Sequence, residues 1–140
     1  MSRITMSLVI AFVFLSANIA RSDMRIRKGG SSWATIEDGG TIRVGGSSVG
    51  TFESDGTVRK DGSSIGKVES NGTIRRGGSS IGKIESNGTL RKGGSSVGKI
   101  ESGGTIRKGG SSWGTASNCC GQFDKMRRVA AVLVFFTDEF

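Results

Sequence analysis

A sixteen-residue unit recurs along most of this chain and limits the folds that it can adopt. Residues 79–94 read SSIGKIESNGTLRKGG, with SSIGKVESNGTIRRGG before them and SSVGKIESGGTIRKGG after them. Units this small cannot bury an apolar face alone, so they must stack or close on one another. The Gly-Thr pair of each unit marks five full copies, and residues 25–28 begin a degenerate one; the threonines are Thr41, Thr57, Thr73, Thr89 and Thr105.

Two turn signals in each unit indicate two short strands per unit. The first signal, ESNGT at residues 85–89, predicts a three-residue hairpin loop with glycine in the left-handed region, which sets Ile84 opposite Leu90. The second signal, KGGS at residues 92–95, predicts a two-residue hairpin, which sets Leu90 opposite Val97. Both assignments place the same three apolar side chains in one row on one face of a sheet.

One feature of the unit does not fit simple alternation. Val97 and Ile100 are three residues apart, so a regular strand would direct them to opposite faces. A glycine follows Val97, and a bulge or bend there would turn both side chains inward. We therefore predict a bulge or bend at the equivalent glycines of four units, Gly50, Gly66, Gly82 and Gly98.

These patterns predict an all-β repeat domain over residues 23–118, with six strands like TIRK and six like SSIGKIE. We expect a closed ring of about five two-stranded hairpins, and a linear β-solenoid is the alternative. Trp33 and Trp113 occupy the same phase of the repeat, five periods apart. Large residues at both ends suit the caps of a solenoid and equally suit a seam where the ring closes.

The repeated Ile-Gly-x-Ile-Glu-Ser-x-Gly-Thr pattern, together with RRVAAVLVFF at residues 127–136, resembles the five-fold β-flower family of small exported bacterial proteins. The resemblance covers about residues 25–136. It implies a ring of five two-stranded petals and no activity. The chain departs from the family pattern in its short RKGGSS turn and in the neighbouring cysteines Cys119 and Cys120.

The N-terminal sequence, MSRITMSLVIAFVFLSANIARSD, has the pattern of a secretory signal peptide. Arg3 supplies a positive charge, an apolar stretch follows, and small residues near positions 20–22 suit cleavage. A membrane anchor is the alternative, but the apolar stretch is shorter than the roughly 20 residues that a span requires. We expect residues 1–22 to be removed and the mature chain, without a transmembrane span, to reach the periplasm or the extracellular space.

Residues 119–140 form a separate C-terminal segment. Its apolar part, MRRVAAVLVFF at residues 126–136, is rich in valine and phenylalanine, which favour a strand. We expect this segment to pack on or into the repeat domain, and a membrane-contact or assembly tail is the alternative. The neighbouring Cys119 and Cys120 could form a disulfide with each other, pair between molecules or stay reduced, and the sequence leaves these alternatives open.

The residue types of the chain argue against catalysis. It has no histidine and no tyrosine, and its glutamates recur once per unit, as architectural groups do. We expect no enzyme activity, no catalytic residues, no cofactor and no metal site. Nucleic acid is also disfavoured, because aromatic side chains for base stacking do not alternate with the basic ones.

The net charge of +8 leaves open a partner that is anionic. We therefore expect a structural or interaction module whose partner is an unknown protein or an anionic cell-envelope polymer. The alternative is a binder of anionic glycan or lipid head groups, because arginine offers a two-pronged donor. The repeated glutamates equally predict exposed ion pairs instead. The candidate anion-binding residues are Arg43, Arg59, Arg75, Arg91 and Arg107.

Overall fold

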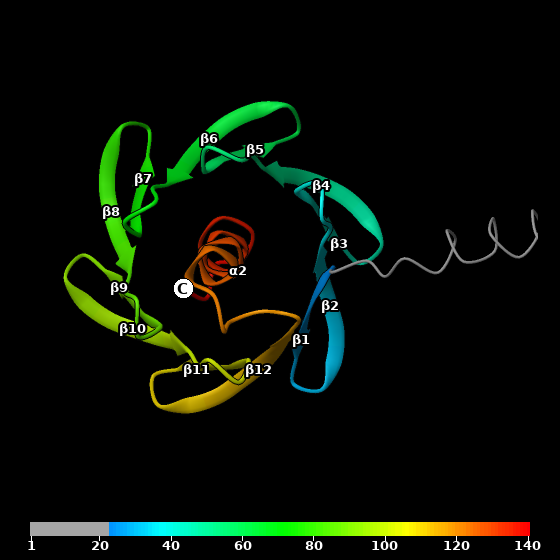
Figure 1. The fold of residues 1–140 in the computed structure, drawn as a ribbon. Helices are drawn as coiled ribbons and strands as arrows, with labels where there is room; N and C mark the ends of the chain where they lie inside the picture. The colour runs from blue at the N-terminus through cyan, green and yellow to red at the C-terminus, as the bar shows by residue number, and fades with distance from the viewer. Residues whose placement is uncertain (1–22) are drawn as a thin grey trace, which may run out of the picture.

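The computed structural model describes residues 23–140, which form a ring of β-strands around one α-helix (Figure 1). The predicted signal peptide at residues 1–22 lies outside the described residues. The elements are β1 (Met24–Lys28), β2 (Ser31–Ile36), β3 (Thr41–Val44), β4 (Ser47–Phe52), β5 (Thr57–Lys60), β6 (Ser63–Val68), β7 (Thr73–Arg76), β8 (Ser79–Ile84), β9 (Thr89–Lys92), β10 (Ser95–Ile100), β11 (Thr105–Lys108), β12 (Ser111–Ser117) and α2 (Phe123–Phe135).

The strands form a closed antiparallel ring in which each strand pairs with its neighbours in sequence and β1 pairs with β12. This closure confirms the predicted all-β ring and excludes the solenoid. Trp33 and Trp113 meet edge to face beside the closure, with their ring centres 5.8 Å apart. The two tryptophans therefore belong to a closure seam and are not caps.

The twelve described strands form six hairpins, each joined by a two-residue turn. The resemblance implies five petals. The sixth hairpin arises because the degenerate copy at residues 25–28 forms a full strand, β1, that pairs on one side with β2 and on the other with β12. We call the end of the ring with these two-residue turns the Gly-Gly rim and the end with the Glu-Ser-x-Gly turns the glutamate rim.

The glutamate-rim turn has the predicted three-residue form. The Glu85 backbone N–H donates to the Thr89 carbonyl at 2.8 Å, and the Gly88 N–H donates to the Glu85 carbonyl at 2.8 Å. Ile84 lies opposite Leu90, as predicted. Gly88 has a φ of +93°, and a Cβ there would collide with the carbonyl of the next hairpin, so only glycine fits this position.

The Gly-Gly-rim turn is a two-residue hairpin, as predicted, but the predicted alignment beyond it is wrong. Leu90 lies opposite Gly98 and not opposite Val97, because the register shifts between Ser96 and Gly98. Val97 is the extra residue of a β-bulge and packs half-buried against the core. The predicted bulge is thus present, one residue before the glycine, and it recurs before Gly50, Gly66 and Gly82.

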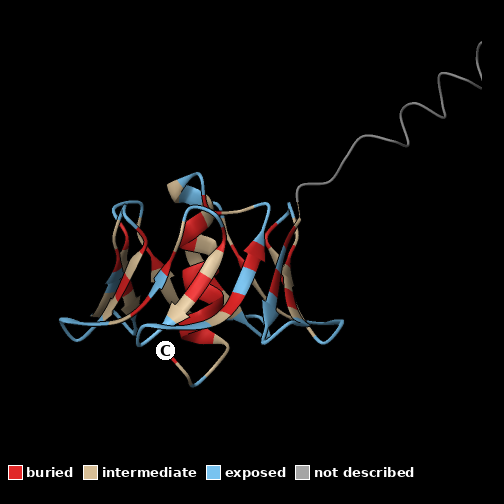
Figure 2. Ribbon diagram, turned by 90° about the horizontal axis from the view of Figure 1, so that it is seen from below, coloured by how far each residue is buried: buried red, intermediate tan, exposed pale blue. Residues whose placement is uncertain are grey.

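The predicted C-terminal strand is also wrong: residues 123–135 form the helix α2, which runs through the centre of the ring (Figures 1 and 2). Every strand of the ring already has a partner on both sides. A strand at the centre would therefore leave its own backbone groups unpaired, whereas a helix satisfies them internally. This requirement outweighs the preference of valine and phenylalanine for strands.

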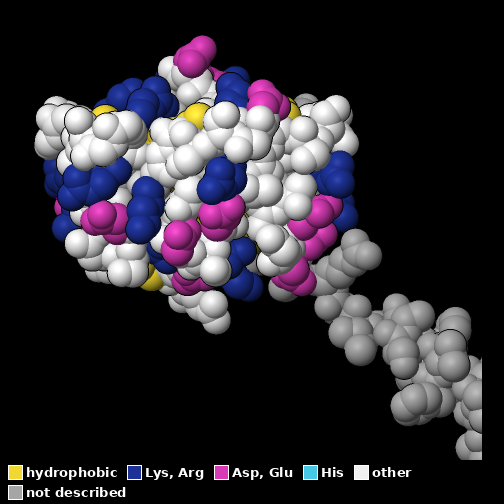
Figure 3. All heavy atoms as spheres, turned by 90° about the horizontal axis from the view of Figure 1, so that it is seen from above, with side chains coloured by type: hydrophobic (Ala, Val, Ile, Leu, Met, Phe, Trp, Pro, Cys, Tyr) yellow, Lys and Arg dark blue, Asp and Glu magenta, His cyan; other side chains and the backbone are white. Residues whose placement is uncertain are grey.

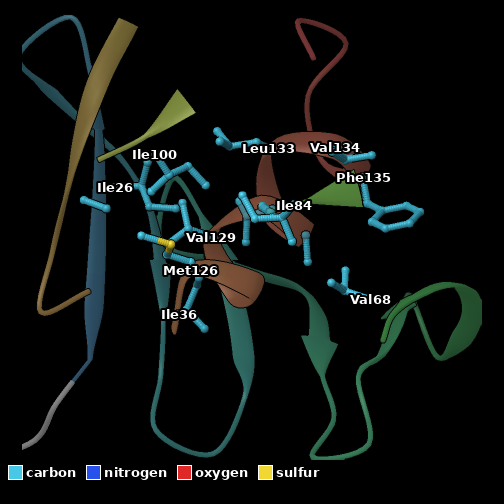
Figure 4. Close-up of a cluster of buried hydrophobic side chains, with 14 of the residues drawn as sticks. Ile26, Ile36, Val68, Ile84, Ile100, Met126, Val129, Leu133, Val134 and Phe135 are labelled. Carbon is cyan, nitrogen blue, oxygen red and sulfur yellow. The ribbon is translucent and has the colours of Figure 1, made fainter. Parts of the chain in front are cut away.

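The core lies between α2 and the inner wall of the ring. In Figure 4, Met126 and Val129 lie among Ile26, Ile36 and Ile100 from strands far apart in sequence. Each strand contributes at least one buried apolar side chain to this wall, and these include Ile26, Ile36, Ile42, Phe52, Val58, Val68, Ile74, Ile84, Leu90, Ile100, Ile106 and Ala116. The helix fills the space that the ring encloses.

Glycines in the wall make room for aromatic rings at the end of α2. A Cβ at Gly50 would lie 2.8 Å from the Phe136 ring, and one at Gly98 would lie 2.9 Å from the Phe140 ring. A Cβ at Gly66 would likewise enter the ring of Phe135. These three bulge glycines therefore accept the aromatic residues that anchor the C-terminal segment.

The link between β12 and α2 turns the chain into the ring. Cys119 and Cys120 form a disulfide with each other, which is one of the alternatives that the sequence leaves open. Asn118 and Cys120 have positive φ angles of 54° and 96°, so this reversal is sharp. None of the helices within residues 23–140 has the length and apolar character needed to cross a bilayer.

Candidate functional site

The five predicted anion-binding arginines lie on the outer wall of the ring, each next to an inward-facing apolar residue. In every copy the arginine Nε donates to a glutamate Oε2 at 2.7–2.9 Å across the glutamate-rim turn. The structure thus brings each arginine together with a glutamate of the same repeat phase. The pairs are Arg43–Glu37, Arg59–Glu53, Arg75–Glu69, Arg91–Glu85 and Arg107–Glu101.

A second hydrogen bond holds each arginine along its hairpin. The NH1 group donates to the carbonyl of a Gly-Gly-rim glycine at 3.3–3.5 Å, as in Arg75 to Gly78. The arginine side chains remain 40–42% exposed. Ion pairs this exposed contribute about 0–1 kcal/mol each, so the guanidinium groups stay accessible to a ligand without being strongly held.

A further set of residues lies beside the arginines, where one hairpin meets the next. At five of these junctions an arginine lies directly opposite the residue two positions before a glutamate, and at the sixth the opposite residue holds the same phase of the repeat. At three consecutive junctions this residue is lysine; the Lys–Arg junctions are Lys67–Arg75, Lys83–Arg91 and Lys99–Arg107. At the other three it is threonine; the Thr–Arg junctions are Thr35–Arg43, Thr51–Arg59 and Thr115–Arg27.

These lysines were not among the candidate residues predicted from the sequence. The signal was present, because positions 35, 51, 67, 83, 99 and 115 hold one phase of the repeat and change from threonine to lysine in three adjacent units. The predicted pairing of Ile84 with Leu90 also contained this information, because it fixes the register between the two hairpins. That pairing places Lys83 beside Arg91 of the following unit.

Shallow grooves lie along two of these junctions. The groove between β8 and β9 has a volume of about 350 Å³ and contains Ser80, Lys83 and Arg91. The equivalent groove between β4 and β5 has a volume of about 370 Å³ and contains Thr51 and Arg59. The second groove also contains the carboxylates of Glu53 and Asp61, so it is far less electropositive.

Figure 3 shows part of the outer wall, where lysine and arginine side chains alternate with acidic ones and few hydrophobic side chains are visible. Such a face presents charge and hydroxyl groups to a partner and little apolar surface. An apolar peptide or an acyl chain therefore has little to bind on this face.

Cations also surround the end of α2 at the Gly-Gly rim. Lys60, Arg76 and Lys108 lie over the rings of Phe136, Phe135 and Phe140 at 6.0, 5.1 and 5.8 Å. Glu139 accepts hydrogen bonds from Lys28 and, at 3.0 Å, from the Trp113 indole. The pKa of the Glu139 carboxyl is lowered, chiefly by the hydrogen bond from Lys28 and also by the one from Trp113. These contacts close the rim over the core.

Asp55, at the glutamate rim, is a second carboxyl group with a shifted pKa. The pKa of Asp55 is lowered, chiefly because its carboxylate accepts a hydrogen bond from the Thr57 backbone N–H. A lowered pKa makes a carboxyl group a weaker base at neutral pH. Within residues 23–140, no cluster of three or more histidine, cysteine, aspartate or glutamate side chains is arranged to hold a metal ion.

Comparisons with models of protein families, with curated proteins and with solved structures find no match to this chain.

Proposed function

We propose that this chain is an exported structural or interaction module without catalytic activity. The observation that carries the proposal is that the ring is filled by its own helix, with Val129, Val132 and Leu133 fully buried. The repeated charged groups of the outer wall are bound to one another in five equivalent ion pairs. An arrangement that repeats around a filled ring suits a rigid support better than one tuned reaction centre.

Two observations support the export part of the proposal. The N-terminal pattern is that of a signal peptide, and the Cys119–Cys120 disulfide suits an oxidising compartment. The test is mass spectrometry of the chain recovered from its native host. A chain found outside the cytoplasm and beginning near residue 22 would support export, and a full-length cytoplasmic chain would exclude it.

The alternative is a binder of anionic glycan or lipid head groups through the arginine ring. The partly exposed guanidinium groups favour it, since donors that the glutamates leave free can reach an anion. The three Lys–Arg junctions add positive charge beside three of these arginines.

The experiment that separates the two is binding of the mature chain to anionic glycans, peptidoglycan and anionic liposomes at two salt concentrations. Salt-sensitive binding that is lost in the Arg75→Glu, Arg91→Glu double variant would establish the alternative. The absence of such binding, with a cross-linked protein partner recovered from the same compartment, is the result expected for the module. Turnover of a substrate by the purified chain would overturn both.

A further inference from the structure

The Lys–Arg junctions place like charges directly opposite each other on neighbouring strands. Side chains in such positions have Cβ atoms about 4.5–5.5 Å apart, and like charges there are destabilising. Each arginine has its glutamate, but within the described residues none of the three lysines forms an ion pair with a carboxylate. The Lys83–Arg91 and Lys99–Arg107 junctions therefore hold two cations and one anion each, whereas Thr51–Arg59 with Glu53 is neutral. At the third junction, Lys67 also lies close enough to the Asp55 carboxylate to contribute to its lowered pKa.

The threonines at the other junctions show that the fold does not require lysine at this position. Thr35, Thr51 and Thr115 occupy equivalent places in the same ring. The lysines are also not scattered, because all three occur at consecutive junctions. The arrangement is destabilising, the fold does not need it, and it is confined to one arc of the wall. These three properties together point to a ligand of opposite charge.

The distribution of charge around the ring agrees with this. Residues 63–108, from β6 to β11, contain nine lysines and arginines and three glutamates, whereas residues 31–60, from β2 to β5, contain three lysines and arginines and four carboxylates. One side of the outer wall is thus basic and another is acidic. The groove beside Lys83 and Arg91 lies in the basic arc, and the groove that contains Asp61 borders the acidic one.

We propose that the outer wall from β6 to β11 binds a linear anionic polysaccharide, with one carboxylate or sulfate group at each Lys–Arg junction. This inference rests on the anion-binding alternative above and moves the site from the whole arginine ring to one arc. Consecutive junctions are two strands apart, roughly 10 Å at the usual strand spacing. That distance is comparable to one disaccharide unit, so a polymer with one acidic group per disaccharide matches the repeat.

The shape of the arc favours this ligand over two others. The junctions follow one another around a convex wall, so a flat bilayer would touch about one junction at a time, whereas a flexible chain can follow all three (Figure 1). Single-stranded nucleic acid binds through aromatic stacking as well as charge. Between β6 and β11 the strands carry no aromatic residue, so the wall offers no platform for bases.

The test uses the mature chain with hyaluronate, which has one carboxylate per disaccharide, and with heparin, a more densely charged sulfated polysaccharide. Anionic phospholipid vesicles and single-stranded DNA serve as comparisons. The first variant, Lys67→Thr, Lys83→Thr, Lys99→Thr, installs the residue that the Thr–Arg junctions already hold. Polysaccharide affinity should fall roughly a hundredfold at low salt, about fivefold for each lysine. A cooperative urea transition with an unchanged or higher midpoint would show that the variant is folded, since removing the like-charge pairs should not lower its stability.

A second variant, Lys83→Thr with Thr35→Lys, keeps the net charge and the number of Lys–Arg junctions but leaves no two of them adjacent. Its affinity for long polysaccharide should fall at least tenfold. Affinity equal to that of the unaltered chain would show that total charge is sufficient and would overturn the inference.

The other outcomes are equally decisive. The triple lysine variant could bind polysaccharide as tightly as the unaltered chain while the Arg75→Glu, Arg91→Glu variant loses binding. That result would overturn the arc and leave the arginine ring as the site. Stronger binding to vesicles or DNA than to either polysaccharide would overturn the ligand class. No binding to any probe would overturn both the arc and the anion-binding alternative, leaving the module without an anionic ligand.

Discussion

Two neighbouring arginines of α2 allow a direct measurement of what holds the helix in the ring. The Arg127 and Arg128 guanidinium groups both lie over Phe52, at 5.7 and 5.5 Å from the ring centre. Only Arg127 also binds the wall: NH2 donates to the Val68 carbonyl at 2.6 Å and Nε to the Glu69 carbonyl at 2.9 Å. Both arginines therefore contact Phe52, but only Arg127 forms hydrogen bonds with backbone carbonyls of the wall.

Arg127→Met should lower the free energy of unfolding by about 3 kcal/mol. Two hydrogen bonds from a charged donor contribute about 1.5–3 kcal/mol each, and part of this is offset because Arg127 loses its hydration on folding. The ion pair with Asp124 adds little, since that carboxylate is 58% exposed. Arg128→Met removes a 3.6 Å contact with Asp124 and the contact over Phe52 that both arginines make, so it should cost about 1 kcal/mol at most.

The assay is urea unfolding followed by the fluorescence of Trp33 and Trp113, which meet at the closure of the ring. Arg127→Lys should recover part of the loss, because lysine can donate to one carbonyl but not to both in the arginine geometry. Arg127→Met and Arg128→Met variants that agree within about 0.5 kcal/mol would refute the reasoning, since the carbonyl bonds would then contribute nothing measurable.

Three further predictions concern the wall and its rims. Gly66→Ala should lower the free energy of unfolding by about 1–3 kcal/mol, because the new methyl group would collide with the Phe135 ring and with the Arg75 carbonyl oxygen. Gly103→Ala has open space and should change the free energy of unfolding by less than about 0.5 kcal/mol, so equal urea midpoints for the two variants would contradict this. The pKa of Glu139 is lower in the folded protein than the ordinary value of 4.5, so the ionised carboxylate stabilises the fold. This stabilisation is complete above pH 4.5 and is lost as the pH falls through the lower pKa of the folded state. A change in Trp113 fluorescence below pH 4.5 should report this loss, and Glu139→Gln should abolish that change. Glu85→Gln should cost less than about 1 kcal/mol in thermal unfolding because its ion pair is exposed, and a loss above about 2 kcal/mol would show that the outer ion pairs hold the ring together.

The turns made much of the ring predictable from the sequence. Because Gly88 needs a left-handed conformation, its turn could be assigned from the residue type, and the pairing of Ile84 with Leu90 followed from that turn. The extra residue at Val97 could be located only to within one position, since valine and glycine can each occupy a bulge. Local chemistry thus determined the strands and hairpins, and the bulge alignment required the paired structure.

The helix could not be predicted from the preferences of its residues. Valine and phenylalanine at positions 129–136 favour a strand on their own. The decisive constraint lies elsewhere in the chain, in strands whose backbone groups are already paired all around the ring. The lysine arc differs in this respect, because the turn that pairs Ile84 with Leu90 also sets Lys83 opposite Arg91, so this juxtaposition could be predicted from the sequence.

The pairing of β1 with β12 also has a consequence for how the chain reaches its folded state. Each hairpin depends on contacts close in sequence and can form early, whereas Arg25 meets Ser117 only after the whole repeat domain has been made. Until then both outer strands present unpaired backbone groups, on which another chain could add a strand. Completion of the last strand, and not of any single repeat, removes both exposed edges and with them the route to aggregation.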